Sequence, residues 1–174
     1  MPDILLHLLP LIAACLLYAT LGFHFWHTRW RETDKPLDPM PMQFWERSAI
    51  FVALTLQGYG LYDGLFSAGG MRFSFSFALS LMLWLAVLIY WLEGFRSRMD
   101  GLQPMVLPLA ALCAALPVIF PQVRIIEHAD TWGFKLHFLA AMLAYSLFTL
   151  SAMHVVFMGF VERKLHHREL TKYL

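Results

Sequence analysis

The stretch KLHFLAAMLAYSLFTLSAMHVVFM, residues 135–158, decides the fold of this chain. Apart from Lys135 it carries no charged side chain, and as an α helix it would be about 36 Å long, enough to cross the roughly 30 Å hydrocarbon core of a bilayer. It also holds two histidines, His137 near one end and His154 near the other. Because an imidazole is costly in hydrocarbon unless it has a partner, each histidine is expected to meet a metal, a hydrogen-bonding group or water.

The composition of the whole chain agrees with a membrane protein. Of its 174 residues, 59% are hydrophobic and 14% are charged, whereas a soluble domain has about 25% charged residues. The net charge is +1 and the sequence contains no basic block, which argues against nucleic-acid binding. Cys15 and Cys113 lie in apolar runs without a CxxC spacing, so they are expected to be packing residues rather than a disulfide.

Five apolar segments are long enough to cross the membrane as helices. They cover residues 4–26, 46–66, 74–93, 104–121 and 134–160, and the charged, proline and glycine residues are concentrated between them. The first segment is too long for a signal-peptide core and no basic region precedes it, so we expect it to be retained. The sequence therefore predicts a single all-α transmembrane domain, residues 1–174, folded as a polytopic bundle of about five helices.

The distribution of lysine and arginine predicts the orientation of this bundle. Ten of the 13 basic residues lie on the side reached after the first, third and fifth segments: Arg29, Arg31, Lys35, Arg47, Arg96, Arg98, Arg163, Lys164, Arg168 and Lys172. The other side holds Arg72, Arg124 and Lys135. By the positive-inside rule, the N-terminus is expected outside and the C-terminus in the cytoplasm, as in a multi-pass protein of the inner membrane.

The histidines of the first and fifth segments lie at matching depths. His7 and His137 are near the outer ends of these segments, and His24 and His154 are near the inner ends. If the two helices are neighbours, the imidazoles oppose each other in two pairs, and two opposed imidazoles can ligate one haem iron. The spacing of 17 residues turns the two histidines of one helix about 100° apart, so one haem is easier to support than two.

These histidines also have a simpler interpretation. An imidazole near the membrane interface can be hydrated, and His137 or His154 could instead donate a hydrogen bond to a carbonyl of a neighbouring helix. His128 precedes the fifth segment and is either an outer-face ligand or an ordinary loop residue.

Three further residues of the outer side have two interpretations each. Trp132 belongs either to the aromatic belt of the interface or to a cofactor site that includes His137, five residues later. Arg72 and Arg124 are either solvated loop residues or the groups that hold the propionates of a haem, which arginine can bind bidentately. The chain has no Walker motif, no GxSxG and no HExxH sequence, so it offers no sign of an enzyme.

The segment WGFKLHFLAAMLAYSLFTLSAMHVVFM, in which His137 is followed by Tyr145, resembles the CcsA/HemX-like cytochrome c assembly protein family. The stretches LLPLIAACLLYA and GGMRFSFSFALSLMLWLAVLIYWLEG look most like its inner-membrane YpjD branch. The resemblance covers essentially the whole chain. It implies that the protein handles haem, because family members transport or present haem on the outer face for attachment to apocytochrome c.

Carried over by position, the resemblance makes His137 the outer-side haem ligand. The tryptophan-rich signature of the family, which also contains aspartate, is represented here only by Trp132 and Gly133. Family members usually have more helices, so the resemblance leads us to expect that this chain is the N-terminal part of a longer protein.

The sequence thus predicts an integral inner-membrane haem-handling protein, accessory to cytochrome c assembly or haem metabolism. Haem b is expected to be bound through His137 and a second histidine, either His7 within the bundle or His128 in the loop. The expected partners are the lipid bilayer, haem, and other membrane subunits or apocytochrome c. The alternative is a non-enzymatic membrane scaffold or interaction subunit in which the histidines are structural.

Overall fold

The computed structural model describes residues 2–30, 42–66, 72–96, 101–121, 124–125 and 131–171, with side chains over 8–29, 42–65, 74–96, 101–121 and 131–163. These residues form the helices α1 (Pro2–Phe25), α2 (Phe44–Phe66), α3 (Phe75–Glu93), α4 (Gln103–Ile119) and α5 (Trp132–Thr171). A π-helical turn, η1 (Trp26–Trp30), continues α1. The prediction of an all-α bundle is confirmed. The largest difference is that α5 continues past the predicted end at residue 160, through a polar stretch of good helix formers.

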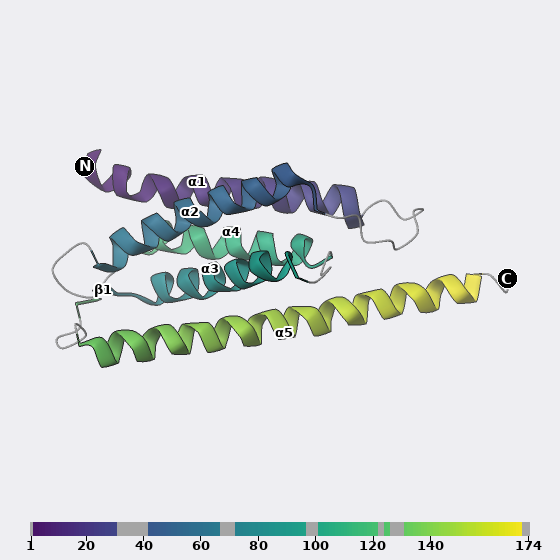
Figure 1. The fold of residues 1–174 in the computed structure, drawn as a ribbon. Helices are drawn as coiled ribbons and strands as arrows, with labels where there is room; N and C mark the ends of the chain where they lie inside the picture. Colours follow the sequence, from purple (N-terminus) through teal and green to yellow (C-terminus); the bar gives the residue numbers. More distant parts are fainter. Residues whose placement is uncertain are drawn as a thin grey trace.

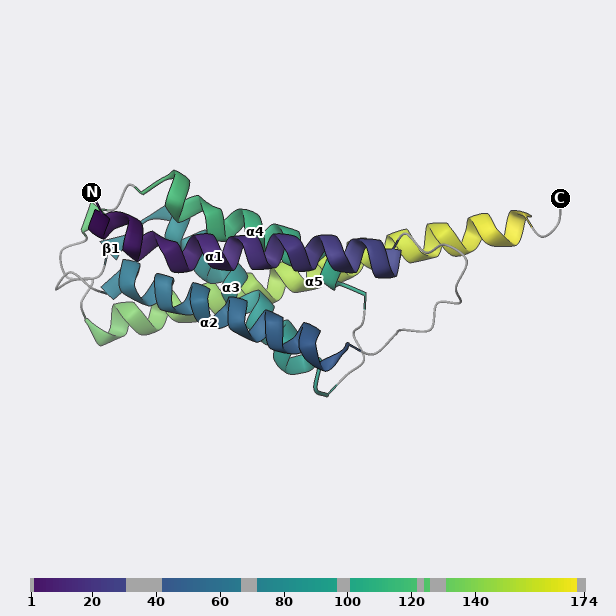
Figure 2. The ribbon, with the colours of Figure 1, turned by 90° about the horizontal axis from the view of Figure 1, so that it is seen from above.

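The helices run alternately in opposite directions, so that α1, α3 and α5 all begin at the same end of the bundle (Figure 1). α1 packs against α2 and α4, and α3 packs against the same two helices from the other side. α5 lies on the outer surface of α3, with only a small contact to α4. Its C-terminal part extends well beyond the other four helices, which both views show (Figures 1 and 2).

The expectation that the first and fifth helices are neighbours is wrong. α3 and α4 lie between α1 and α5, which are on opposite sides of the bundle (Figure 1). The reason is that the faces of α1 that carry small residues and leucines bury themselves against α2 and α4, whereas α5 packs through a single stripe against α3. The predicted pairs His7–His137 and His24–His154 required α1 and α5 to be neighbours, and this condition is not met.

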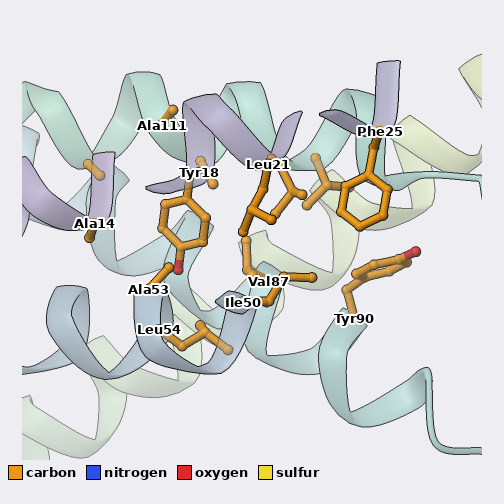
Figure 3. Close-up of a cluster of buried hydrophobic side chains, with 14 of the residues drawn as sticks. Ala14, Tyr18, Leu21, Phe25, Ile50, Ala53, Leu54, Val87, Tyr90 and Ala111 are labelled. Atoms are coloured by element: carbon orange, nitrogen blue, oxygen red, sulfur yellow. The ribbon is translucent and has the colours of Figure 1, made fainter. Parts of the chain in front are cut away.

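The largest buried cluster joins α1, α2, α3 and α4 near the middle and one end of the bundle. Figure 3 shows its members interdigitating between the helices: Ala14, Tyr18, Leu21, Phe25, Ile50, Ala53, Leu54, Val87, Tyr90 and Ala111. A second cluster, which includes Leu11, Leu61 and Phe77, fills the other end and receives Phe138 from α5. The four-helix core is thus continuous from end to end, and α5 is added at its edge.

Glycines allow α1 to approach its neighbours closely. A Cβ atom added at Gly22 would lie 2.9 Å from the Cδ and Cγ atoms of Pro108 in α4. A Cβ atom added at Gly60 in α2 would lie 2.7 Å from Cγ of Leu11. Small residues at helix contacts are the usual means of close packing in membranes, where burial from water does not drive association.

Two short strands join the connections at the end where α1, α3 and α5 begin. β1 (Arg72–Phe73) pairs antiparallel with β2 (Arg124–Ile125), with Arg72 opposite Ile125 and Phe73 opposite Arg124. We call this pairing the ladder and this end of the bundle the ladder end. The opposite end, where α1 ends and α2 begins, is called the His24 end.

Among the residues that the structure describes, three helical stretches are long and apolar enough to cross a membrane: Leu8–Arg29, Phe75–Glu93 and Trp132–Arg163. α4 is a shorter apolar helix, with Pro108 and Pro117 inside it. The outward surface of the described residues is rich in large apolar side chains, among them Leu16, Phe23, Phe51 and Phe148. Both features suit a membrane protein.

Candidate functional site

His137 and His154, the two histidines of α5, both have exposed side chains. Neither makes a hydrogen bond or an ion pair within the part of the chain that the structure describes. They also lie near the two ends of the bundle rather than at its centre. His137 neighbours Phe138, which belongs to the same buried cluster as Phe77 in the first turn of α3. His154 is one turn before Phe157, which lies against Gly101, just before α4.

His24 has a partner that the sequence did not suggest. Its Nε2 atom lies 3.1 Å from Oε1 of Glu46, the glutamate in the first turn of α2. The imidazole also packs edge-on against Trp45, with 4.9 Å between the ring centroids. A hydrogen bond to a carboxylate explains how this histidine is accommodated at the end of α1, and it does so without a metal.

Glu46 is the centre of the most elaborate polar cluster in the described residues. The residue is only 4% exposed, and its two carboxylate oxygens face three donors. Arg29 donates from Nη2 to Oε2 over 3.2 Å, and the backbone N–H of Gln43 donates to Oε2 over 2.7 Å. The second bond is one half of a capping box, in which a glutamate at the third helical position accepts a hydrogen bond from the backbone N–H of the residue before the helix.

Arg29 reaches this carboxylate because η1 prolongs α1 beyond Phe25. Its guanidinium also stacks over the Phe25 ring, 4.8 Å from the centroid. The sequence contained a signal for the cluster, since Gln43 and Glu46 have the capping-box spacing directly after a proline-rich stretch. Which cation contacts Glu46 depends on how α1 and α2 cross, and the local sequence does not predict this crossing.

A second arginine closes the same end of the bundle. Arg47 donates from Nη2 to the carbonyl oxygen of Gly94 at the end of α3, and its guanidinium lies 4.9 Å from the ring centroid of Phe95. Trp91 donates a hydrogen bond from Nε1 to the carbonyl oxygen of Arg47. Cationic donors at a helix C-terminus compensate its unpaired carbonyls and its dipole. The His24 end is therefore held by polar contacts that are structural in character.

Other residues of the predicted site belong to backbone segments at the ladder end. The ladder brings the backbones of Arg72 and Arg124 onto adjacent strands, and α5 begins a few residues later with Trp132. The side chain of Trp132 is 87% exposed. His7 belongs to the first turns of α1 at this end, but its side chain lies outside the described residues, and so do those of the two arginines. His128 lies outside the described residues altogether.

Within the described ranges, no group of three or more His, Cys, Asp or Glu side chains could hold a metal ion. A haem iron needs only one or two axial ligands, and a neutral imidazole is a suitable one. His137 fits that requirement in part, because its ring is exposed and uncommitted, whereas His24 is engaged by Glu46. The described residues place no second histidine opposite His137.

No protein-family model, no curated protein and no solved structure matches this chain.

Proposed function

We propose that this chain is an integral inner-membrane protein that handles haem at its ladder end, as an accessory of cytochrome c assembly or haem metabolism. In this proposal all five helices cross the bilayer, with the ladder end outside and the His24 end in the cytoplasm. Haem b is held by His137, and its other contacts come from Trp132, Arg72 and Arg124. The partners are the lipid bilayer, haem, and either other membrane subunits or apocytochrome c.

Packing supports five crossings. α2 and α4 lie side by side with α1 and α3 over most of their lengths, so a bilayer that contains the latter pair contains the former as well (Figures 1 and 2). At about 1.5 Å per residue, α4 is about 25 Å long, which a slight local thinning of the bilayer accommodates. The arginines and tryptophans of the His24 end suit the cytoplasmic interface.

The observation that carries the haem proposal is the open imidazole of His137 at the end of the bundle that also contains the ladder. An unpaired histidine on a membrane helix is a candidate functional residue, because an unused polar ring is disfavoured there. Arginines are suited to carboxylates such as the propionates of haem. Because α1 and α5 are not neighbours, the proposed site lies at the rim of the bundle rather than in its interior. In this proposal the second axial ligand is supplied by His128 or by a partner subunit.

A visible spectrum of the purified protein tests this proposal. The chain is purified in detergent from haem-replete cells, and a Soret band is expected that is lost in His137→Ala. His154→Ala is the matched control, because it removes another exposed histidine of the same helix, at the other end of the bundle. A folded, colourless wild-type protein, or equal loss of the band in both variants, would refute haem binding at His137.

A non-enzymatic membrane scaffold is the second candidate, and the exposure of α5 favours it. Over the span Trp132–Arg163 only 6% of the most apolar window is buried within the chain. The outward surface of α5 includes small residues such as Ala140, Ala144 and Ser151, which permit close contact with another helix. In this proposal the function is to bind another membrane subunit through α5.

A measurement of assembly distinguishes the scaffold proposal from the haem proposal. Ala144→Trp places a bulky side chain on the outward surface of α5, where lipid accommodates it but a closely packed helix does not. If α5 is an assembly surface, native mass spectrometry of the protein extracted from its own membranes shows a complex that this variant loses. Unchanged assembly in Ala144→Trp, or a monomer from the start, removes the scaffold proposal and leaves the haem spectrum unaffected.

A further inference from the structure

Two polar atoms in the middle of the bundle are buried without a partner. The hydroxyl oxygen of Tyr18 in α1 and Oε1 of Gln57 in α2 are both excluded from solvent, and neither has a hydrogen bond within the described residues. Both residues have 0% exposed surface. Leaving such groups unpaired costs free energy, and the cost is larger in an apolar surrounding.

The orientation of the Gln57 amide follows from its other contacts. Its Nε2 atom donates to the carbonyl oxygen of Ser80 over 3.2 Å and to the Ser80 hydroxyl over 3.1 Å. A carbonyl oxygen only accepts, so the amide nitrogen must face Ser80 and Oε1 must point away from α3. The amide therefore presents an unused acceptor toward the interior of the bundle.

Tyr18 reaches the same part of α2. Its ring extends from α1 toward α2, and the hydroxyl points toward Ala53, a member of the same cluster (Figure 3). Gln57 is one turn further along α2, on the same face as Ala53, and a long helical side chain leans back over the preceding turn. The two helices thus direct one hydroxyl and one amide oxygen into the same small region.

We propose that Tyr18 and Gln57 hold a buried water molecule between α1 and α2. A single O–H group satisfies both atoms at once, because its oxygen accepts from the Tyr18 hydroxyl while its hydrogen is donated to Oε1 of Gln57. Water is the smallest molecule with such a group, and both residues are completely enclosed. Buried waters in proteins commonly satisfy such otherwise unpaired polar groups. The site is independent of the proposed haem site, since it lies in the four-helix core rather than beside α5.

Radiolytic hydroxyl-radical labelling tests this site in the full chain, reconstituted in lipid nanodiscs. Ordered water next to a buried aromatic ring generates radicals locally, so Tyr18 is expected to be labelled several-fold faster than Phe25. Phe25 is the internal control, because it is equally buried in the same helix and core cluster but has no hydroxyl group. Labelling of Tyr18 no faster than that of Phe25 would overturn the proposal, and this comparison needs no variant.

The variant Gln57→Met then tests whether the amide holds the water. It keeps the length of the side chain and removes the acceptor, so the labelling of Tyr18 should fall to the level of Phe25. If Tyr18 is labelled as fast in Gln57→Met as in the wild type, Gln57 does not hold the water and the bridging site is refuted. If thermal unfolding shows coupling between Tyr18→Phe and Gln57→Met while wild-type Tyr18 stays unlabelled, the two side chains bond directly and water is excluded.

Discussion

At the scale of single residues, the chain uses its buried charge for structure at the His24 end. Glu46 is almost completely enclosed, yet each of its oxygens is matched by a donor from α1 or from the residue before α2. A buried carboxylate is tolerated only when such bonds satisfy its oxygens. Glu46 therefore ties the end of α1 and η1 to the start of α2.

Replacing this carboxylate should destabilise the protein. Glu46→Gln removes one accepting oxygen and the negative charge beside the Arg29 guanidinium, so the free energy of unfolding should fall by about 2 kcal/mol, the size of a hydrogen bond to a charged group. Thermal unfolding in detergent measures the change. Glu93→Gln is the control, because the Glu93 carboxylate makes no hydrogen bond or ion pair within the described residues. Equal melting temperatures for the two variants would contradict the structural role of Glu46.

At the scale of helices, the contact of α1 with α4 depends on the absence of a side chain at Gly22. The neighbouring atoms belong to the rigid ring of Pro108, which cannot rotate away as a leucine can. A methyl group there must push the two helices apart.

We expect Gly22→Ala to lower the free energy of unfolding by about 1–3 kcal/mol, as other insertions into packed cores do. Gly159→Ala in α5 is the matched control, because a Cβ atom added there meets nothing within 4 Å. That control should be neutral or slightly stabilising, since alanine is the better helix former by about 1 kcal/mol. Chemical unfolding of both variants in the same detergent decides the matter, and a neutral Gly22→Ala would show that the contact relaxes freely.

The fifth helix should respond to mutation on one stripe only. The residues of α5 that pack against the bundle recur at helical spacing: Phe134, Phe138, Met142, Leu150, Met153 and Phe157. Phe157 also lies against Gly101, just before α4. Phe138→Ala should cost about 1–2 kcal/mol, less than the loss in a water-soluble core because lipid is as apolar as the core itself. Phe148→Ala, at a site that is 72% exposed, should leave the melting temperature unchanged. Equal losses at both positions would mean that α5 packs differently in the membrane.

At the scale of the whole molecule, the alternating helices and the basic residues at the His24 end predict one orientation. A fluorescent-protein fusion after Gly101 or at the C-terminus should be bright, because both points lie at the proposed cytoplasmic side. A phosphatase fusion after Thr131 should be active, because that point lies at the proposed outer side. The reverse pattern would invert the orientation and place the ladder end in the cytoplasm, which would remove the outer-face haem proposal.

The ends of the helices could be predicted from the sequence because they depend on local chemistry. Apolar runs of membrane length, interrupted by charged and proline-rich connections, predicted all five helices within a few residues, except for the end of α5. Its extension to Thr171 was missed because the polar tail does not need a bilayer to be helical, and hydrophobicity alone could not reveal it.

What only the tertiary structure decided is which surfaces meet. His7, His24, His137 and His154 looked like pairs because their depths match, and depth follows from position along a helix. The neighbours of a helix depend instead on close contacts such as Gly22 with Pro108, which draw α1 toward α2 and α4 and leave α5 on α3. The pairing of His24 with Glu46 has the same origin. The sequence by itself determined the helices and, apart from the end of α5, their ends, because these follow from local hydrophobicity. The partners of each histidine depended instead on packing between segments far apart in the chain.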